Sequence, residues 1–276
     1  ISDNQCDFAR GDRANDRHRH TWNHRVTEDL KLHVYVAAIV LARVSSFLAV
    51  VPVLSTLRVP PLVRAHLALV LSLTVTVNLY PSILSVVTKT AGGDFIGLVS
   101  AEVVKGLFLG FLVRLFFVAL AFAGDFISQL AGYSGMMAPS VMEGEPATPL
   151  ANLLVIFATV VFFIQDLHLL LIEKLMASYA TMPPGAGLDH FQSFDQLASA
   201  LSTAFMTALQ ISGPFVIYVM VCNIVLGLAN RLVPQVPIQL VSAPLMMLGG
   251  LFIAMFTLGL AAQVFLGSLA DWMGAN

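Results

Sequence analysis

Hydrophobic residues form long runs along most of this chain, and only its first thirty or so residues lack an apolar pattern. A helix needs about 20 apolar residues in a row to cross the hydrocarbon core of a bilayer. A soluble protein of this length would show narrow amphipathic stripes instead of such runs. We therefore predict about six apolar helices, at roughly 33–51, 66–87, 95–133, 150–180, 197–231 and 245–269.

Proline and glycine mark the breaks between and within these segments. Pro52 ends the first segment, and the pair Gly213-Pro214 predicts a kink in the fifth, because proline removes a helical hydrogen bond. Three prolines, at 234, 237 and 244, predict a break before the sixth segment. The expected fold class is an all-α polytopic membrane protein, with some helices kinked or broken and packed as helical hairpins.

The composition agrees with this class, since 58% of the residues are hydrophobic and 11% are charged, against about a quarter charged in soluble domains. Residues 1–32 are polar and predict a disordered tail, and 33–276 form the predicted helical membrane domain. Acidic residues in the tail largely cancel its basic ones, so nucleic acid is not an expected partner. Two cysteines make neither a disulfide framework nor a metal set, and we expect no cofactor.

The third segment, 95–133, carries an unusual number of charges for an apolar helix. Glu102 and Lys105 stand three residues apart, where helical side chains can pair. Charges inside a membrane helix are costly, and they usually face protein or a water-filled cavity. We expect this helix to contact partner subunits or to face a polar lumen. The residues proposed for this role are Glu102, Lys105, Gly106, Gly110, Arg114 and Asp125, where the two glycines form a G-x-x-x-G pattern that allows close helix packing.

A segment rich in Gly, Pro, Met and Ser follows, at 132–149. Irregular backbone between spanning helices must be buried in protein or line a cavity. Its methionines, Met136, Met137 and Met142, are flexible apolar side chains suited to a deformable seal. A surface loop that happens to carry methionines is the alternative interpretation.

Parts of the sequence also fit two other functional classes, an intramembrane protease and a solute transporter. The sequence Gly132-Tyr133-Ser134-Gly135, with His168 later in the chain, has the minimum pair of a rhomboid-like serine protease. However, Ser134 precedes a Pro/Gly-rich loop instead of a long apolar helix, and a four-residue motif recurs by chance. A small-solute secondary transporter would use the broken helices and the charges of the third segment, but the two halves show no repeat of these features. We expect that the protein is not an enzyme.

Three ordered stretches resemble the FliR/SctT/YscT/SpaR family of type III export apparatus membrane proteins, from about residue 33 onward. The most specific resembles the family pattern N-x-x-x-G-x-x-x-R-x-x-P-Q with a later proline, and comprises Asn223, Gly227, Arg231, Pro234, Gln235 and Pro244. The other two contain His168, Ser178-Tyr179 and Pro183-Pro184-Gly185, and Arg43, Pro52, Val59-Pro60 and Arg64. Ala138-Pro139 departs from the Asp-Pro that the family often has in the loop after the third segment.

The resemblance implies a subunit that joins P-type and Q-type membrane subunits, and larger export-gate membrane proteins, around a central pore. Unfolded flagellar proteins would pass through that pore, in the bacterial inner membrane at the flagellar basal body. The loop 132–149 would plug the closed pore with its methionines, and the Asn223–Pro244 motif would fix a structural turn. The Asn-Arg-Leu-x-Pro-Gln stretch favours a flagellar system over an injectisome, which stays the alternative.

Overall fold

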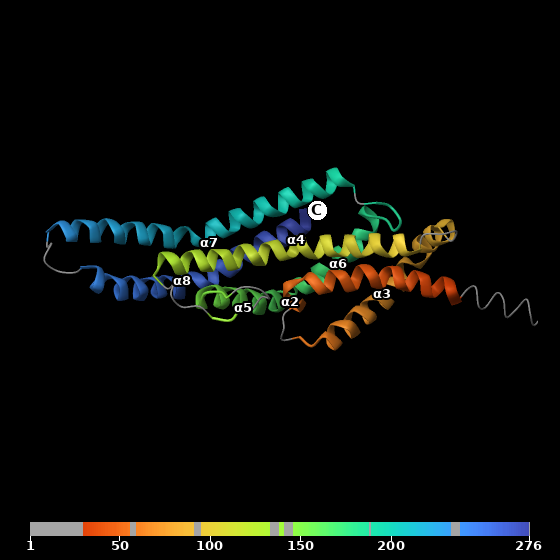
Figure 1. Ribbon diagram of the computed structural model, residues 1–276, viewed down its shortest axis with the longest axis horizontal. Coiled ribbons are helices and arrows are strands. Elements are labelled where there is room, and N and C mark those ends of the chain that lie inside the picture. The colour runs from red at the N-terminus through yellow and green to blue at the C-terminus, as the bar shows by residue number, and fades with distance from the viewer. Residues whose placement is uncertain are drawn as a thin grey trace, which may run out of the picture.

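The structure is a computed structural model that describes residues 30–55, 59–90, 95–132, 138–140, 146–187, 189–232 and 238–275. Nearly all of these residues are helical, and their one extended feature is an isolated bridge between Ala138 and Ala147 (Figure 1). The all-α prediction is confirmed. The helices are Leu30–Val50, α2 (Pro52–Ser55), α3 (Pro61–Thr90), α4 (Phe95–Leu130), α5 (Pro149–Ile164), α6 (Leu167–Thr181), α7 (His190–Leu232) and α8 (Ile238–Ala275).

Two helical hairpins flank the long α4 helix. In the first, Leu30–Val50 packs against α3, and the ring of His33 stacks on Tyr80 with 4.6 Å between the ring centroids. In the second, α7 and α8 lie together and extend beyond the ends of the other helices (Figure 1). The buried face of α4 contacts both hairpins as well as α5, so α4 is the central element of the chain.

Five described helices are long and apolar enough to cross a membrane, and the bent pair α5–α6 makes up to six. Large apolar side chains on the α7–α8 hairpin are exposed along both helices, among them Phe205, Ile217, Ile224, Leu248, Met255 and Phe256. Such surfaces are stable only against lipid or other protein. The chain is therefore a multi-pass membrane protein, as the sequence predicts.

The fourth predicted segment, 150–180, is not one helix. It divides into α5 and α6, which meet at 76°. Asp166 adopts the left-handed conformation, with φ at 56°, and the backbone turns the corner between the two helices at this residue. Aspartate tolerates this region better than most residues do. The break has no proline or glycine to announce it, which is why the pattern of apolar residues missed it.

The other boundaries also differ from the prediction in places. Residues 30–32, assigned from sequence to the tail, belong to the first helix. Pro214 lies inside the continuous helix α7, which changes direction partway along its length (Figure 1). Pro244 lies inside α8 and not in the break before it, because α8 already begins at Ile238.

Candidate functional site

A cluster of three charged side chains lies at the centre of the molecule. Glu102 on α4 accepts hydrogen bonds from Arg43 Nε, at 2.6 Å, and from Lys105 Nζ, at 2.8 Å. All three residues have 0% solvent exposure. The structure thus places Glu102 and Lys105 in contact, as their spacing predicts. Their expected role needs correction, because they face neither a partner nor a lumen but the interior of this chain.

Neutral groups complete the coordination of the two cations. Arg43 donates to Ser178 Oγ at 3.2 Å and to the carbonyl oxygen of Met182 at 2.8 Å, and its guanidinium lies 4.0 Å from the centre of the Tyr179 ring. Lys105 donates to the carbonyl oxygen of Pro183 at 2.9 Å. The cluster therefore ties together the first helix, α4, the end of α6 and the segment that follows it.

The two glycines of the G-x-x-x-G pattern bring the first helix close to this cluster. A Cβ added at Gly106 would collide with the carbonyl oxygen of Arg43 and with Ser46 Oγ, and one at Gly110 would come within 2.9 Å of the carbonyl oxygen of Phe47. Both positions therefore permit the close helix contact that small residues allow. This contact lies within the chain, so the predicted packing against another subunit is corrected to packing against Leu30–Val50.

Hydrogen bonds between Asp125 and Thr148 attach the end of the predicted plug loop to α4. Asp125 Oδ1 accepts hydrogen bonds from Thr148 N at 3.0 Å and Thr148 Oγ1 at 2.8 Å, and Ser128 Oγ donates to Thr148 Oγ1 at 2.8 Å. Thr148 is also the N-cap of α5. Asp125 is half-buried, so this contact within the chain leaves its expected role toward a partner or lumen a prediction.

A short backbone pairing closes the same loop. Ala138 and Ala147 exchange two backbone hydrogen bonds, of 2.9 and 3.0 Å, and Asn152 Nδ2 donates to the carbonyl oxygen of Pro139 at 3.0 Å. The loop therefore leaves α4 and returns to α5 from a fixed base. Met136, Met137 and Met142, predicted to form its seal, lie outside the described residues.

Arg114 is the one charge of the predicted α4 set that the fold does not pair, within the part of the chain that the structure describes. Its side chain is half-buried, and its contacts there include no hydrogen bond or ion pair. Its expected role of facing a partner or a polar lumen stays a prediction.

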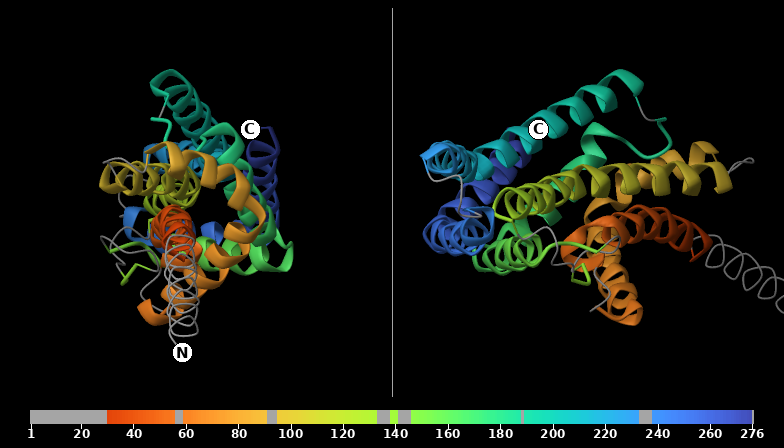
Figure 2. Two further views of the ribbon diagram at one scale, coloured as in Figure 1. Left: turned by 90° about the vertical axis from the view of Figure 1, so that its right-hand side faces the viewer. Right: turned by 60° about the vertical axis from the view of Figure 1, so that its left-hand side comes forward.

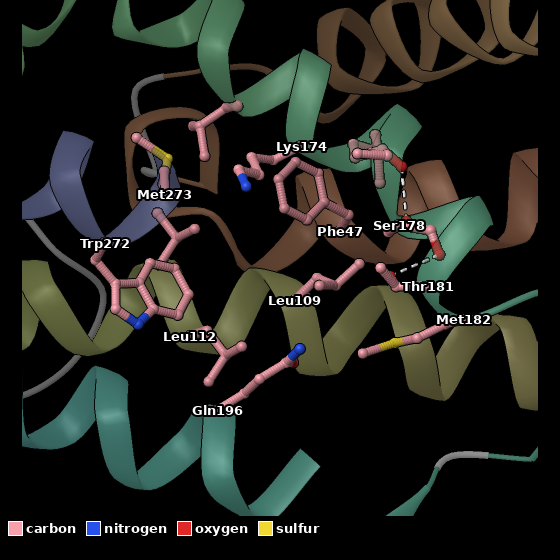
Figure 3. Close-up of a pocket in the computed structure, with 14 residues that line it drawn as sticks. Phe47, Leu109, Leu112, Lys174, Ser178, Thr181, Met182, Gln196, Trp272 and Met273 are labelled. Carbon is pink, nitrogen blue, oxygen red and sulfur yellow. Dashed lines mark hydrogen bonds between the residues drawn. The ribbon is translucent and has the colours of Figure 1, made fainter. Parts of the chain in front are cut away.

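A small cavity of about 80 Å³ adjoins the charge cluster, between α4, α6, α7 and the end of α8 (Figure 3). It shares Ser178 and Met182 with the cluster, and Lys174 and Gln196 line it from α6 and α7. The rest of its lining is mainly apolar, with Trp272 on one side (Figure 3). Phe47 of the first helix also borders it, so the cavity is a packing gap at a junction of five helices, and its lining has no arrangement of acid, base and nucleophile.

The protease interpretation gains no support from the geometry. Ser134 lies outside the described residues, and His168 lines an apolar cavity with its Nδ1 buried and without a hydrogen-bond partner in the described part of the chain. A catalytic histidine needs a group that orients its ring.

Part of the predicted turn motif lies in α7, and part lies outside the residues that the structure describes. Asn223, Gly227 and Arg231 lie exposed near the end of α7, whereas Pro234 and Gln235 lie outside the described residues. The three helical positions therefore precede the turn, and all three residues are exposed.

Three residues of the internal network were not predicted as site residues: Arg43, Ser178 and Thr148. A signal was present for Arg43, since a lone arginine in an apolar run requires a carboxylate partner. For Ser178 and Thr148 the sequence offers no such signal, because serine and threonine often bond to their own helix.

The sequence pattern of the family described as Bacterial export proteins, family 1, matches residues 34–272. The chain is 30% identical to the flagellar biosynthetic protein FliR of Caulobacter vibrioides, over 84% of this chain and 91% of that protein. It is 27% identical to the flagellar biosynthetic protein FliR of Escherichia coli, over 76% of this chain and 79% of that protein. It is 32% identical to the secretion system apparatus protein SsaT of Salmonella typhimurium, over 55% of this chain and 59% of that protein.

Proposed function

This chain belongs to the bacterial export proteins, family 1, and from that membership we propose that it is a core membrane component of the flagellar type III protein export gate. It forms part of the pore through which unfolded flagellar proteins are exported. The observation that carries the proposal is the family match, which extends from the first helix to the end of α8. The multi-pass helical architecture is the one that such a component requires.

The arrangement of polar groups supports a subunit of a larger assembly. The buried charges of α4 are satisfied inside the chain, so this helix bundle holds its own shape. Unpaired apolar faces lie on α7 and α8, where 22% of each spanning window is buried, and on α3, where 17% is. We propose that these faces meet P-type and Q-type subunits and the larger export-gate membrane proteins, in the bacterial inner membrane at the flagellar basal body.

The loop between α4 and α5 is the proposed plug of the closed pore. A gate must block ions and yet open for a polypeptide of any sequence, and flexible methionine side chains can do both without binding the substrate tightly. The hydrogen bonds at Asp125, Thr148 and the Ala138–Ala147 bridge support this role, since they hold the base of the loop next to α4 and α5. Deleting 136–145 should make the membrane leaky to ions while export survives in part. An intact ion barrier in that deletion would refute the plug.

Complementation tests the proposed function in cells. A strain whose own copy of this chain is deleted should lose motility and secretion of flagellin, and the plasmid-borne chain should restore both. The relationship to SsaT gives the injectisome alternative a specific basis. Loss of effector secretion with flagellar assembly intact would assign the chain to that system instead.

A further inference from the structure

An apolar cavity of about 240 Å³ separates the first hairpin from the corner between α5 and α6. Phe47 borders it on the first helix, Leu67 and Leu71 on α3, and Phe163 and His168 at the corner. All of its lining side chains except His168 are apolar. The first half of α3 inclines away from its neighbours (Figure 2), and only 17% of its spanning window is buried.

A cation, Arg64, precedes the cavity-lining residues of α3 along the helix. Arg64 lies three and seven residues before Leu67 and Leu71, so the three side chains share one face of α3, with Arg64 about one turn beyond Leu67. Arg64 is half-buried, and its Nε is covered without a hydrogen-bond partner in the described residues. Within those residues Arg64 also has no ion pair. Among the described residues, the positive charge of Arg64 beside this apolar cavity therefore has no counter-ion.

We infer that this cavity binds one anionic phospholipid, with an acyl chain between α3 and the α5–α6 corner and the phosphate on Arg64. The chain lies in a membrane, where an apolar cavity takes up hydrocarbon and excludes water. The ligand must also carry a negative charge that can pair with Arg64, about one helical turn from Leu67, and the phosphate of an anionic lipid supplies it. The bound lipid fills the gap left by the inclined start of α3 and holds the hairpin against α6. This inference concerns lipid and does not depend on the proposed export role.

Native mass spectrometry of the full-length chain tests the site. The protein is delipidated in detergent and titrated with phosphatidylglycerol or with phosphatidylcholine of the same acyl chains. The wild type should bind one phosphatidylglycerol in preference to phosphatidylcholine, by about fivefold, because one basic residue near a lipid headgroup contributes about that factor. Arg64→Gln should remove the preference. Arg231→Gln, at an exposed arginine near the end of α7, should keep it.

Filling the cavity separates acyl binding from charge. Leu71→Trp should weaken phosphatidylglycerol binding at least about tenfold, which corresponds to about two methylene groups no longer buried. Leu73→Trp is the matched control, because Leu73 is 54% exposed on the same helix and does not line the cavity. Equal binding by wild type, Leu71→Trp and Leu73→Trp would overturn the inference. If Leu71→Trp fails to fold, a lipid preference unchanged in Arg64→Gln would overturn it equally.

Discussion

Replacing Glu102 by glutamine should be among the most damaging single changes in this chain. The carboxylate is fully buried and is the only anion that contacts Arg43 and Lys105 among the described residues. Glutamine keeps the shape of the side chain but removes its charge. The variant therefore leaves two positive charges buried together, with only neutral groups as partners.

The size of the effect follows from the burial. Breaking a buried ion pair by removing one partner costs about 3–5 kcal/mol, because the remaining charge is uncompensated. Glu102→Gln should fall in that range. Lys105→Met removes a cation instead, so Arg43 and Glu102 remain paired, and its main cost is the lost bond to Pro183, about 1–3 kcal/mol. The double variant Glu102→Gln/Lys105→Met has a net buried charge of one positive charge, the same as the wild type. It should therefore be no less stable than Glu102→Gln alone.

Equilibrium unfolding of the purified chain in mixed detergent micelles, titrated with SDS and followed by far-UV circular dichroism, measures these differences. Glu173→Gln is the control, since Glu173 is an exposed carboxylate on α6 and its removal should change the unfolding free energy by less than about 0.5 kcal/mol. The reasoning that the cluster depends on one shared carboxylate would be refuted by either of two results. Glu102→Gln could be as stable as this control, or Lys105→Met could be less stable than Glu102→Gln.

Three further changes probe other parts of the chain. Gly106→Ala should destabilise the fold by about 1–3 kcal/mol in the same assay, because its Cβ would collide with the facing helix, whereas Gly259→Ala has open space and should be neutral or slightly stabilising. Asp125→Ala should cost about 1–3 kcal/mol and raise ion leakage in cells, since the backbone N–H of Thr148 loses its acceptor; unchanged leakage would separate the loop base from the gate. Ser134→Ala should leave motility unchanged, and loss of a proteolytic activity in that variant would restore the protease interpretation.

The long helices were predictable because span length depends only on a local run of apolar residues. The Glu102–Lys105 contact was predictable for a similar reason, since both residues stand on one helical turn. The contacts of Arg43, the third member of the cluster, were not predictable. Arg43 is 59 positions away from Glu102, and Ser178 is 135 positions away from Arg43. Such contacts depend on which helices pack together, and apolar periodicity carries no information about that choice.

The wrong assignments share one physical cause. Charges in an apolar helix must have partners, but the sequence does not say whether a partner belongs to the same chain or to another. The spacing predicts that Glu102 and Lys105 face partners or a lumen, and the fold instead buries and pairs both internally. The α5–α6 corner is not predicted from the sequence because the backbone turns at Asp166, without a proline or glycine. Pro244, conversely, was read as part of a turn and lies within a helix.

Co-purification tests the central claim most directly. The chain, tagged at its C-terminus and expressed in its native cell, is extracted in mild detergent, and the proteins bound to it are identified by mass spectrometry. The account predicts recovery of P-type and Q-type flagellar subunits. Recovery of injectisome subunits instead would contradict the flagellar assignment, and a stable protein without partners would contradict the export gate altogether.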